Sequence, residues 1–210
     1  MADIQAFRNR IIECGYVLDP EGVHHEFVSG MHGQKLDFDN IDEETDPLYD
    51  EWIDVNEGFI RENFTRLPEI IIGVARGTNR LALDTARRFE GEVVGLVSKK
   101  DSENSKSLYL PQLAKSIIGA LSTELLVVVE DVGTTGSNSV QVATQSREAG
   151  AEQVVVVTTW KRRERLERLE EAGMPYLPII DEPLRTFEPE ECRSDPGGFC
   201  YRNWQFIPRG

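Results

Sequence analysis

The sequence has few of the residues that build metal centres and disulfide frameworks. It contains three cysteines and three histidines among 210 residues. Cys14, Cys192 and Cys200 follow no zinc-ligand spacing, and an odd number of cysteines is typical of reduced thiols. The eight-residue separation of the last two leaves a disulfide or a metal ligand pair open as the weaker alternative. We therefore expect no metal held by protein ligands alone.

Long hydrophobic runs are also missing. No apolar stretch approaches the roughly 18 residues that a membrane-spanning helix needs, and the first residues lack the charged and apolar regions of a signal peptide. We therefore expect a cytoplasmic protein without a membrane partner.

Positive charge is scarce as well. The chain has 37 acidic and 23 basic residues, for a net charge of −14, and only six of its cations are lysines. This balance argues against nonspecific binding to nucleic acid or anionic lipid. An anionic small molecule would have to meet a local cluster of cations.

The stretch from Leu125 to Ser139, LLVVVEDVGTTGSNS, is the centre of the sequence. Its apolar, mostly branched residues 125–129 predict a buried parallel strand. Glu130 and Asp131 follow at the carboxyl end, where open α/β sheets place their ligand crevice, so we expect both acids to be solvated. The small residues after them would bring backbone N–H groups to the positive end of the next helix, which is a cradle for phosphate.

Two common nucleotide-binding motifs do not apply to this stretch, since it has neither a terminal Gly-Lys-Ser/Thr nor the G-x-G-x-x-G spacing. One structural alternative is an ordinary strand-to-helix turn, with a Thr or Ser N-cap and two solvated acids.

The segment VVVEDVGTTGSNS resembles the phosphoribosyl-pyrophosphate (PRPP) signature of type I phosphoribosyltransferases. The resemblance implies that the two acids hold the ribose 2′ and 3′ hydroxyls and that the following loop binds the 5′-phosphate. Asn138 departs from the Ser or Thr that is usual there. The implied PRPP-binding residues are Glu130, Asp131, Gly133, Thr134, Thr135, Gly136, Ser137 and Asn138, with Asp131 also in a catalytic role.

A second predicted strand, residues 69–74, leads into Ala75-Arg76-Gly77-Thr78-Asn79 and another helix. This stretch resembles the pyrophosphate loop of the same family, with Thr78 in place of a glycine. The resemblance implies that Ala75, Arg76, Gly77 and Thr78 hold pyrophosphate around a non-proline cis peptide. Alternatively, Arg76 simply pairs with an acid of the next helix.

A third strand over 92–97 precedes thirteen polar-leaning residues, 98–110, which predict a mobile loop. In the family this is the catalytic flap, which implies catalytic roles for Lys99, Lys100 and Lys106. The loop lacks the histidine and glycine that orotate enzymes carry there, and Lys106 is equally well explained as a solvated side chain.

The acceptor base is the least constrained part of the prediction. Residues 24–41 loosely resemble the amino-terminal hood of orotate phosphoribosyltransferases, and a further strand at 154–159 leads to Trp160 and Lys161. The implied base-binding residues are Lys35, Phe38, Trp160 and Lys161. Trp160 packed beneath a helix and charges facing water are the alternatives.

Together these patterns predict an α/β fold, with an open, mainly parallel twisted sheet, helices on both faces and a small N-terminal hood. We expect one domain, with helix and hood at 1–66, core at 67–181 and tail at 182–210. The resemblance implies transfer of ribose 5-phosphate from PRPP to a nucleobase, orotate slightly ahead of purines, with Mg²⁺ bound mainly through PRPP and a homodimer. A PRPP-sensing regulator and a receiver-like signalling domain are the alternatives from other classes.

Overall fold

The computed structural model describes residues 3–18, 23–26, 32–41, 45–101, 107–184, 186–187, 190, 199–202 and 205–208. Its largest sheet joins five strands that run parallel, so helices must connect them. In order across the sheet these strands are β11 (Tyr176–Asp181), β10 (Gln153–Lys161), β9 (Leu125–Gly133), β5 (Ile70–Gly73) and β6 (Val94–Val97).

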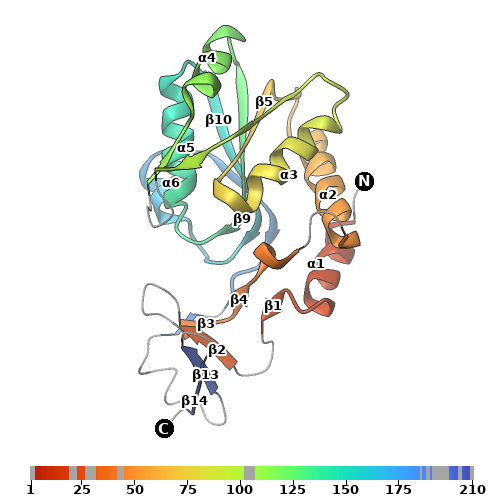
Figure 1. Cartoon of the computed structure of the whole chain (residues 1–210), viewed down its shortest axis with the longest axis vertical. Helices are drawn as coiled ribbons and strands as arrows, with labels where there is room; N and C mark the ends of the chain where they lie inside the picture. Colours follow the sequence, from red (N-terminus) through yellow and green to blue (C-terminus); the bar gives the residue numbers. More distant parts are fainter. Residues whose placement is uncertain are drawn as a thin grey trace.

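Helices cover both faces of this sheet (Figure 1). Successive strand residues point to opposite faces, so Val127 and Val129 belong to one apolar cluster while Leu126 and Val128 belong to the other. One face is covered by α1 (Ile4–Glu13), α2 (Pro47–Asn63) and α3 (Ala75–Arg87), and the other by α4 (Gln112–Ala120), α5 (Ser137–Glu148) and α6 (Glu167–Glu171). The predicted fold class is confirmed.

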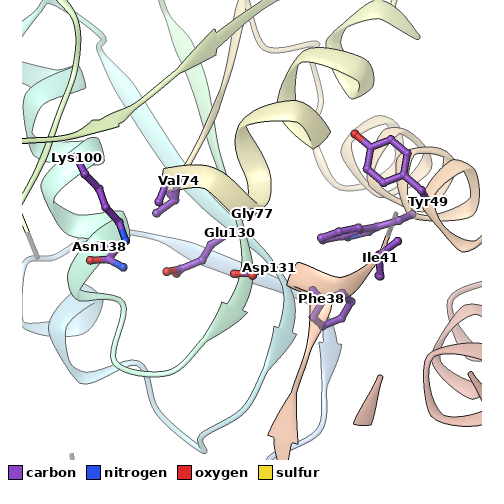
Figure 2. A pocket seen from close by; sticks show the side chains of 11 residues that line it. Phe38, Ile41, Tyr49, Val74, Gly77, Lys100, Glu130, Asp131 and Asn138 are labelled. Atoms are coloured by element: carbon purple, nitrogen blue, oxygen red, sulfur yellow. The ribbon is translucent and has the colours of Figure 1, made fainter. Parts of the chain in front are cut away.

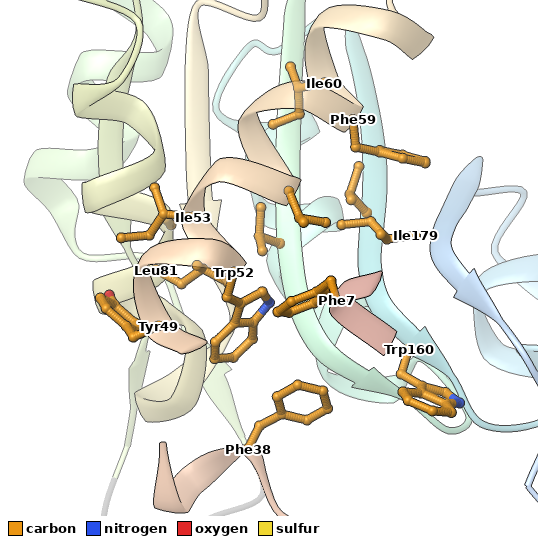
Figure 3. Packing of buried hydrophobic residues seen from close by; sticks show 14 of the residues in the cluster. Phe7, Phe38, Tyr49, Trp52, Ile53, Phe59, Ile60, Leu81, Trp160 and Ile179 are labelled. Carbon is orange, nitrogen blue, oxygen red and sulfur yellow. The ribbon is translucent and has the colours of Figure 1, made fainter. Parts of the chain in front are cut away.

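The buried aromatic side chains of the described core gather in the cluster beneath α1 and α2 (Figure 3). The Trp52 side chain is buried on α2, and its indole N–H donates to Thr159 Oγ1 over 2.7 Å, tying α2 to β10. Phe38, from the short 3-10 helix η1 (Phe38–Asn40), packs against Trp52 with ring centroids 4.9 Å apart. This contact holds the segment after the hood against the sheet.

A second five-stranded sheet unites the two ends of the chain. The hood contains a hairpin, since Glu26 pairs with His32 in antiparallel register. The tail joins this sheet, because β13 runs parallel to β2 with Phe199 opposite Val23. Its order is β12 (Thr186–Phe187), β3 (His32–Gly33), β2 (Val23–Glu26), β13 (Phe199–Arg202) and β14 (Gln205–Pro208), and β1 (Val17–Leu18) separately pairs with β4 (Lys35–Leu36).

Helix α2 begins at Pro47, where the Asp46 carboxylate accepts the Leu48 N–H. Two boundaries differ from the prediction. Strand β9 continues to Gly133, four residues past its apolar run. The predicted loop 98–110 contains a short antiparallel hairpin of β7 (Lys99–Lys100) and β8 (Leu108–Tyr109). In the described part of the chain, no helix has the length and apolar character of a membrane span.

Candidate active site

The order of strands places a crevice between β5 and β9. These strands are neighbours, but the chain leaves β5 through α3 toward β6 and leaves β9 through α5 toward β10, on the opposite side. The two connections diverge there, and such switch points are where parallel sheets bind ligands. A cavity of about 580 Å³ opens at this point (Figure 2), lined by Phe38, Ile41, Tyr49, Trp52, Val74, Ala75, Gly77, Lys100, Glu130, Asp131 and Asn138.

The two acids on β9 face different surroundings. Alternation along β9 puts Glu130 on the same face as Val128, toward α5, and Asp131 on the face of α2 and α3. Glu130 is only 7% exposed and accepts a hydrogen bond of 2.5 Å from Ser139 Oγ. Burial raises its pKa to about 8, although the Ser139 hydroxyl opposes this shift and the Asp131 charge adds to it. Asp131 is half-buried and accepts the Val132 N–H.

The prediction that both acids are solvated is therefore wrong for Glu130. The extension of β9 to Gly133 keeps Glu130 inside the sheet, so its side chain is covered by α5. Of the two carboxylates, Asp131 is the more accessible to a ligand.

Helix α5 begins at the cavity without a side-chain cap. Its N-cap is Gly136 at a φ of +79°, a conformation that favours glycine, and a Cβ there would lie 2.5 Å from Leu169 Cγ. The Thr135 and Ser137 hydroxyls lie 2.9 Å apart in the same turn. The alternative of a Thr or Ser N-cap is wrong, and the first amides of α5 keep the capacity to bind an anion.

Helix α3 begins at the other side of the same cavity, and it too has no side-chain cap. The helix begins directly at Ala75, so no loop intervenes, and Ala75 has a left-handed φ of +58°. Its N–H donates to Ser98 Oγ over 2.9 Å. The expected cis peptide is wrong, since the described backbone contains none. The side chain of Arg76 lies outside the described residues.

The Thr78 side chain fixes the start of α3, and its predicted role, through its backbone amide, stays a prediction. It is fully buried, and its hydroxyl bonds to the backbone of Val74 and to the carbonyl of Val129, both at 2.8 to 2.9 Å. Thr78 therefore ties α3 to β5 and β9. Gly73 is required beside it, because a Cβ there would lie 2.3 Å from the Thr78 carbonyl oxygen.

Of the two described lysines in the predicted flap, Lys100 reaches the cavity. It lies on the side of Asn138, near the start of α5 (Figure 2). Lys99 is exposed on the same strand and is not among the lining residues, and Lys106 lies outside the described residues.

The opposite end of the cavity is aromatic. Phe38, Tyr49 and Trp52 line it together with Ile41, and Tyr49 meets Trp52 edge-on with centroids 6.3 Å apart. Sequence reasoning found Phe38 and missed the other three. The available signal was Asp46-Pro47, an N-cap followed by a proline at the first helical position, which places Tyr49 and Trp52 three apart on one face of α2.

The other predicted base-binding residues lie away from the cavity lining. Lys35 pairs with Asp37 at 3.1 Å, and Lys161 pairs with Asp181 at 2.7 Å. Trp160 is 1% exposed and donates its indole N–H to the Glu182 carbonyl over 2.7 Å. The structure therefore places Trp160 in the core, as the packing alternative expected. Among the described side chains, no group of three histidines, cysteines or acids could hold a metal.

Comparison with solved structures shows which known proteins share this arrangement. Orotate phosphoribosyltransferase from Aeropyrum pernix superposes with a TM-score of 0.58 at 20% identity, covering 83% of this chain and 93% of that one. Adenine phosphoribosyltransferase from Saccharomyces cerevisiae gives a TM-score of 0.58 at 13% identity, covering 84% and 99%. The chain has the type I phosphoribosyltransferase fold.

The sequence match to a curated relative covers a smaller part of the chain than the structural match does. Orotate phosphoribosyltransferase from Rhodopseudomonas palustris strain BisB5 is 40% identical over 81 residues, which are 38% of this chain and 42% of that protein. The match thus spans less than half of the relative's length. No model of a known protein family matches the sequence. The likeness to the type I phosphoribosyltransferases inferred from residues 127–139 is confirmed at the level of fold and partial sequence.

Proposed function

We propose that this chain is a PRPP-dependent phosphoribosyltransferase, a pentosyltransferase that joins a nucleobase to ribose 5-phosphate and releases pyrophosphate. One observation carries the proposal: two helices without side-chain caps begin at one cavity, which also contains a carboxylate pair. Helix amino termini bind phosphate groups, and PRPP has a phosphate at one end and a pyrophosphate at the other. The cavity volume of about 580 Å³ suits such a ligand.

The proposed arrangement assigns each end of PRPP to one helix. The 5′-phosphate binds at Gly136, Ser137 and Asn138, and the pyrophosphate binds the amides of Arg76 and Gly77. The ribose hydroxyls donate to Asp131, which is accessible, and to Glu130 when its carboxylate is ionised. The base then faces the aromatic end, where its ring nitrogen attacks the C1 atom of the ribose.

Catalysis in this arrangement is positional and electrostatic. The site holds both reactants in line, so the attack becomes effectively unimolecular. Lys100 offsets negative charge that builds on the leaving pyrophosphate. Closure of the flap over the ligands excludes water, which would otherwise hydrolyse PRPP.

Mg²⁺ is the cofactor that this chemistry calls for, since it prefers phosphate oxygens, a few carboxylates and water to a cage of protein ligands. The described residues fit that mode, because they offer the accessible carboxylate of Asp131 beside the proposed ribose. The ion would neutralise pyrophosphate charge while bound through PRPP.

Two acceptor classes follow from two different observations. Orotate is the first, because the curated relative is an orotate phosphoribosyltransferase by name. A purine is the second, because the rings of Phe38, Tyr49 and Trp52 give this end of the cavity an aromatic lining, whereas Lys35 and Lys161 are already paired with carboxylates.

The deciding experiment measures pyrophosphate release from Mg²⁺ and PRPP with orotate, uracil, xanthine, guanine, hypoxanthine and adenine in turn. We expect release with one base class only. Tight PRPP binding without release for any base would instead identify a PRPP-sensing protein. The division at residues 66 and 181, the homodimer and the cytoplasmic location stay predictions.

A further inference from the structure

The flap strand β8 is bound on one edge by two glutamine side chains from α5. Leu108 N–H donates to Gln141 Oε1 over 2.8 Å, and the Leu108 carbonyl accepts from Gln145 Nε2 over 2.9 Å. Leu110 N–H donates to Gln145 Oε1, also over 2.9 Å. The two side chains thus form the hydrogen bonds that a neighbouring strand would otherwise make. We name Gln141 and Gln145 the glutamine clamp.

The clamp connects the two parts of the cavity that must meet for the proposed reaction. Gln141 and Gln145 are four residues apart, so they share one face of α5, and the helix begins at Gly136 beside the cavity. On the other edge of β8, Leu108 pairs with Lys100 of β7. Leu108, whose backbone N–H and carbonyl bind the clamp, therefore lies directly opposite Lys100 in the β7–β8 hairpin. Lys100 in turn lines the cavity.

Satisfying the backbone hydrogen bonds of β8 would not by itself require two ordered glutamine side chains. The bonds are only partly buried, so water could satisfy the same backbone groups. Ordering two glutamines also costs side-chain entropy, which is among the largest of any residue type. The clamp adds something that water cannot: a fixed distance between the helix at the proposed phosphate site and the strand that carries Lys100.

We propose that Gln141 and Gln145 are positioning residues that hold Lys100 over the bound PRPP by fixing β8 to α5. The inference rests on the proposed function for the role of Lys100. The clamp itself is a property of the fold and can be tested separately.

The first test measures the clamp without any substrate. The variants are Gln141→Ala, Gln145→Ala and the double variant, and the control is Gln153→Ala, an exposed glutamine at the start of β10. We expect amide hydrogen exchange at Leu108 and Leu110, and tryptic cleavage after Lys100, to accelerate about tenfold in the double variant. Exchange in β9 and the behaviour of Gln153→Ala should match the wild type. Unchanged exchange and cleavage would overturn the proposal.

The second test asks whether the clamp acts through Lys100. The double clamp variant should lower kcat about tenfold with the KM for the base unchanged. In a Lys100→Ala background it should cause no further loss, because the residue that it positions is gone. An equal loss in both backgrounds would show a general structural role and would contradict the proposal.

A third variant separates the two bonds of Gln145. Gln145→Glu keeps an acceptor for the Leu110 N–H and loses the donor to the Leu108 carbonyl, so we expect an effect between those of wild type and Gln145→Ala. If no base supports turnover, the same cycle is run on PRPP affinity by calorimetry. If PRPP does not bind at all, the proposed function fails, while the exchange and cleavage results still decide the clamp.

Discussion

Two strand-to-helix junctions, β5–α3 and β9–α5, meet at the cavity. Each brings a helix amino terminus to the cavity, but with different residues in the turn. Both helices begin without a side-chain cap, and both junctions contain a residue at positive φ. At β9–α5 that residue is Gly136, in a turn with the hydroxyls of Thr135 and Ser137. At β5–α3 it is Ala75, and the nearby Thr78 hydroxyl is buried and hydrogen-bonded to the backbone of Val74 and Val129.

The difference separates two sources of affinity for an anion. The β9–α5 junction combines backbone amides with side-chain hydroxyls, which suits a single phosphate held from several directions. The β5–α3 junction offers amides alone among the described atoms, on a backbone fixed by Thr78 and Ser98. We expect the β9–α5 junction to bind phosphate more tightly. We expect the β5–α3 junction to bind the pyrophosphate leaving group more weakly, so that it can be released.

The largest expected effect comes from removing the carboxylates between the two junctions. A Glu130→Ala/Asp131→Ala double variant should lose PRPP binding entirely, because no other described acid lines the cavity. Calorimetry with Mg²⁺ and PRPP measures this. Glu152→Ala, an exposed acid just before β10, serves as the control and should bind normally. Unchanged affinity in the double variant would remove the basis for the ribose assignment.

Gly136→Ala tests the β9–α5 junction directly. The new Cβ would meet Leu169 at 2.5 Å on a backbone with φ of +79°, so we expect about 2 to 4 kcal/mol of destabilisation. Affinity for ribose 5-phosphate should fall at least tenfold in the fraction that stays folded. Gly150→Ala is the matched control, because Gly150 also has positive φ but its Cβ would approach nothing closer than 3.8 Å. It should lose stability and keep the affinity.

The pH dependence of stability tests the burial of Glu130. Between its ordinary pKa of 4.5 and the raised value of about 8, the folded protein keeps a proton that the unfolded chain has released. The free energy of unfolding should therefore fall as pH rises through this window, by at most about 1.4 kcal/mol per pH unit.

Denaturation in urea at several pH values measures the slope for wild type and for Glu130→Gln. The variant cannot ionise, so its stability should fall less steeply with pH. Parallel curves for the two proteins would mean that Glu130 is ionised and solvated, as the sequence alone suggested.

The flap lysines give a smaller contrast. Lys100→Ala should lower kcat about tenfold, because Lys100 reaches the cavity, whereas Lys99→Ala should change it less than twofold. Steady-state kinetics with saturating PRPP checks this order. A larger loss of kcat in Lys99→Ala than in Lys100→Ala would mean that Lys99, and not Lys100, faces the ligand.

The smallest expected effects concern the aromatic residues. Trp160→Phe removes one hydrogen bond to the Glu182 carbonyl and should cost about 1 kcal/mol of stability with no change in the KM for the base. Phe38→Leu should raise that KM several-fold, by roughly 1 kcal/mol of lost aromatic contact. A KM effect in Trp160→Phe alone would restore Trp160 as a base-binding residue.

The two junctions also show how much could be predicted from sequence. The β9–α5 junction was readable in part, because Glu130, Asp131 and Asn138 of its motif line the cavity. The burial of Glu130 was not readable, since it depends on Ser139 and on three further residues of strand pairing beyond the apolar run. The direct start of α3 at Ala75 was also hidden, because an alanine at positive φ leaves no trace in a sequence pattern.

Contacts between distant segments limited the rest of the prediction. Trp160 and Lys161 stand at the right strand end for a ligand, yet Glu182 and Asp181 of the neighbouring β11 segment engage them. The tail strands β13 and β14 complete the hood sheet, which no local periodicity indicates. The aromatic end of the cavity depends on α2 and η1 packing against each other, and only Phe38 was found in advance.

The most direct test of the account is an amide NMR titration with the two halves of PRPP and then with PRPP itself, each with Mg²⁺. We predict that ribose 5-phosphate shifts the Ser137 and Asn138 amides, that pyrophosphate shifts those of Arg76 and Gly77, and that PRPP shifts both sets together. If PRPP left either helix amino terminus unchanged, the claim that one ligand bridges the two junctions would be contradicted.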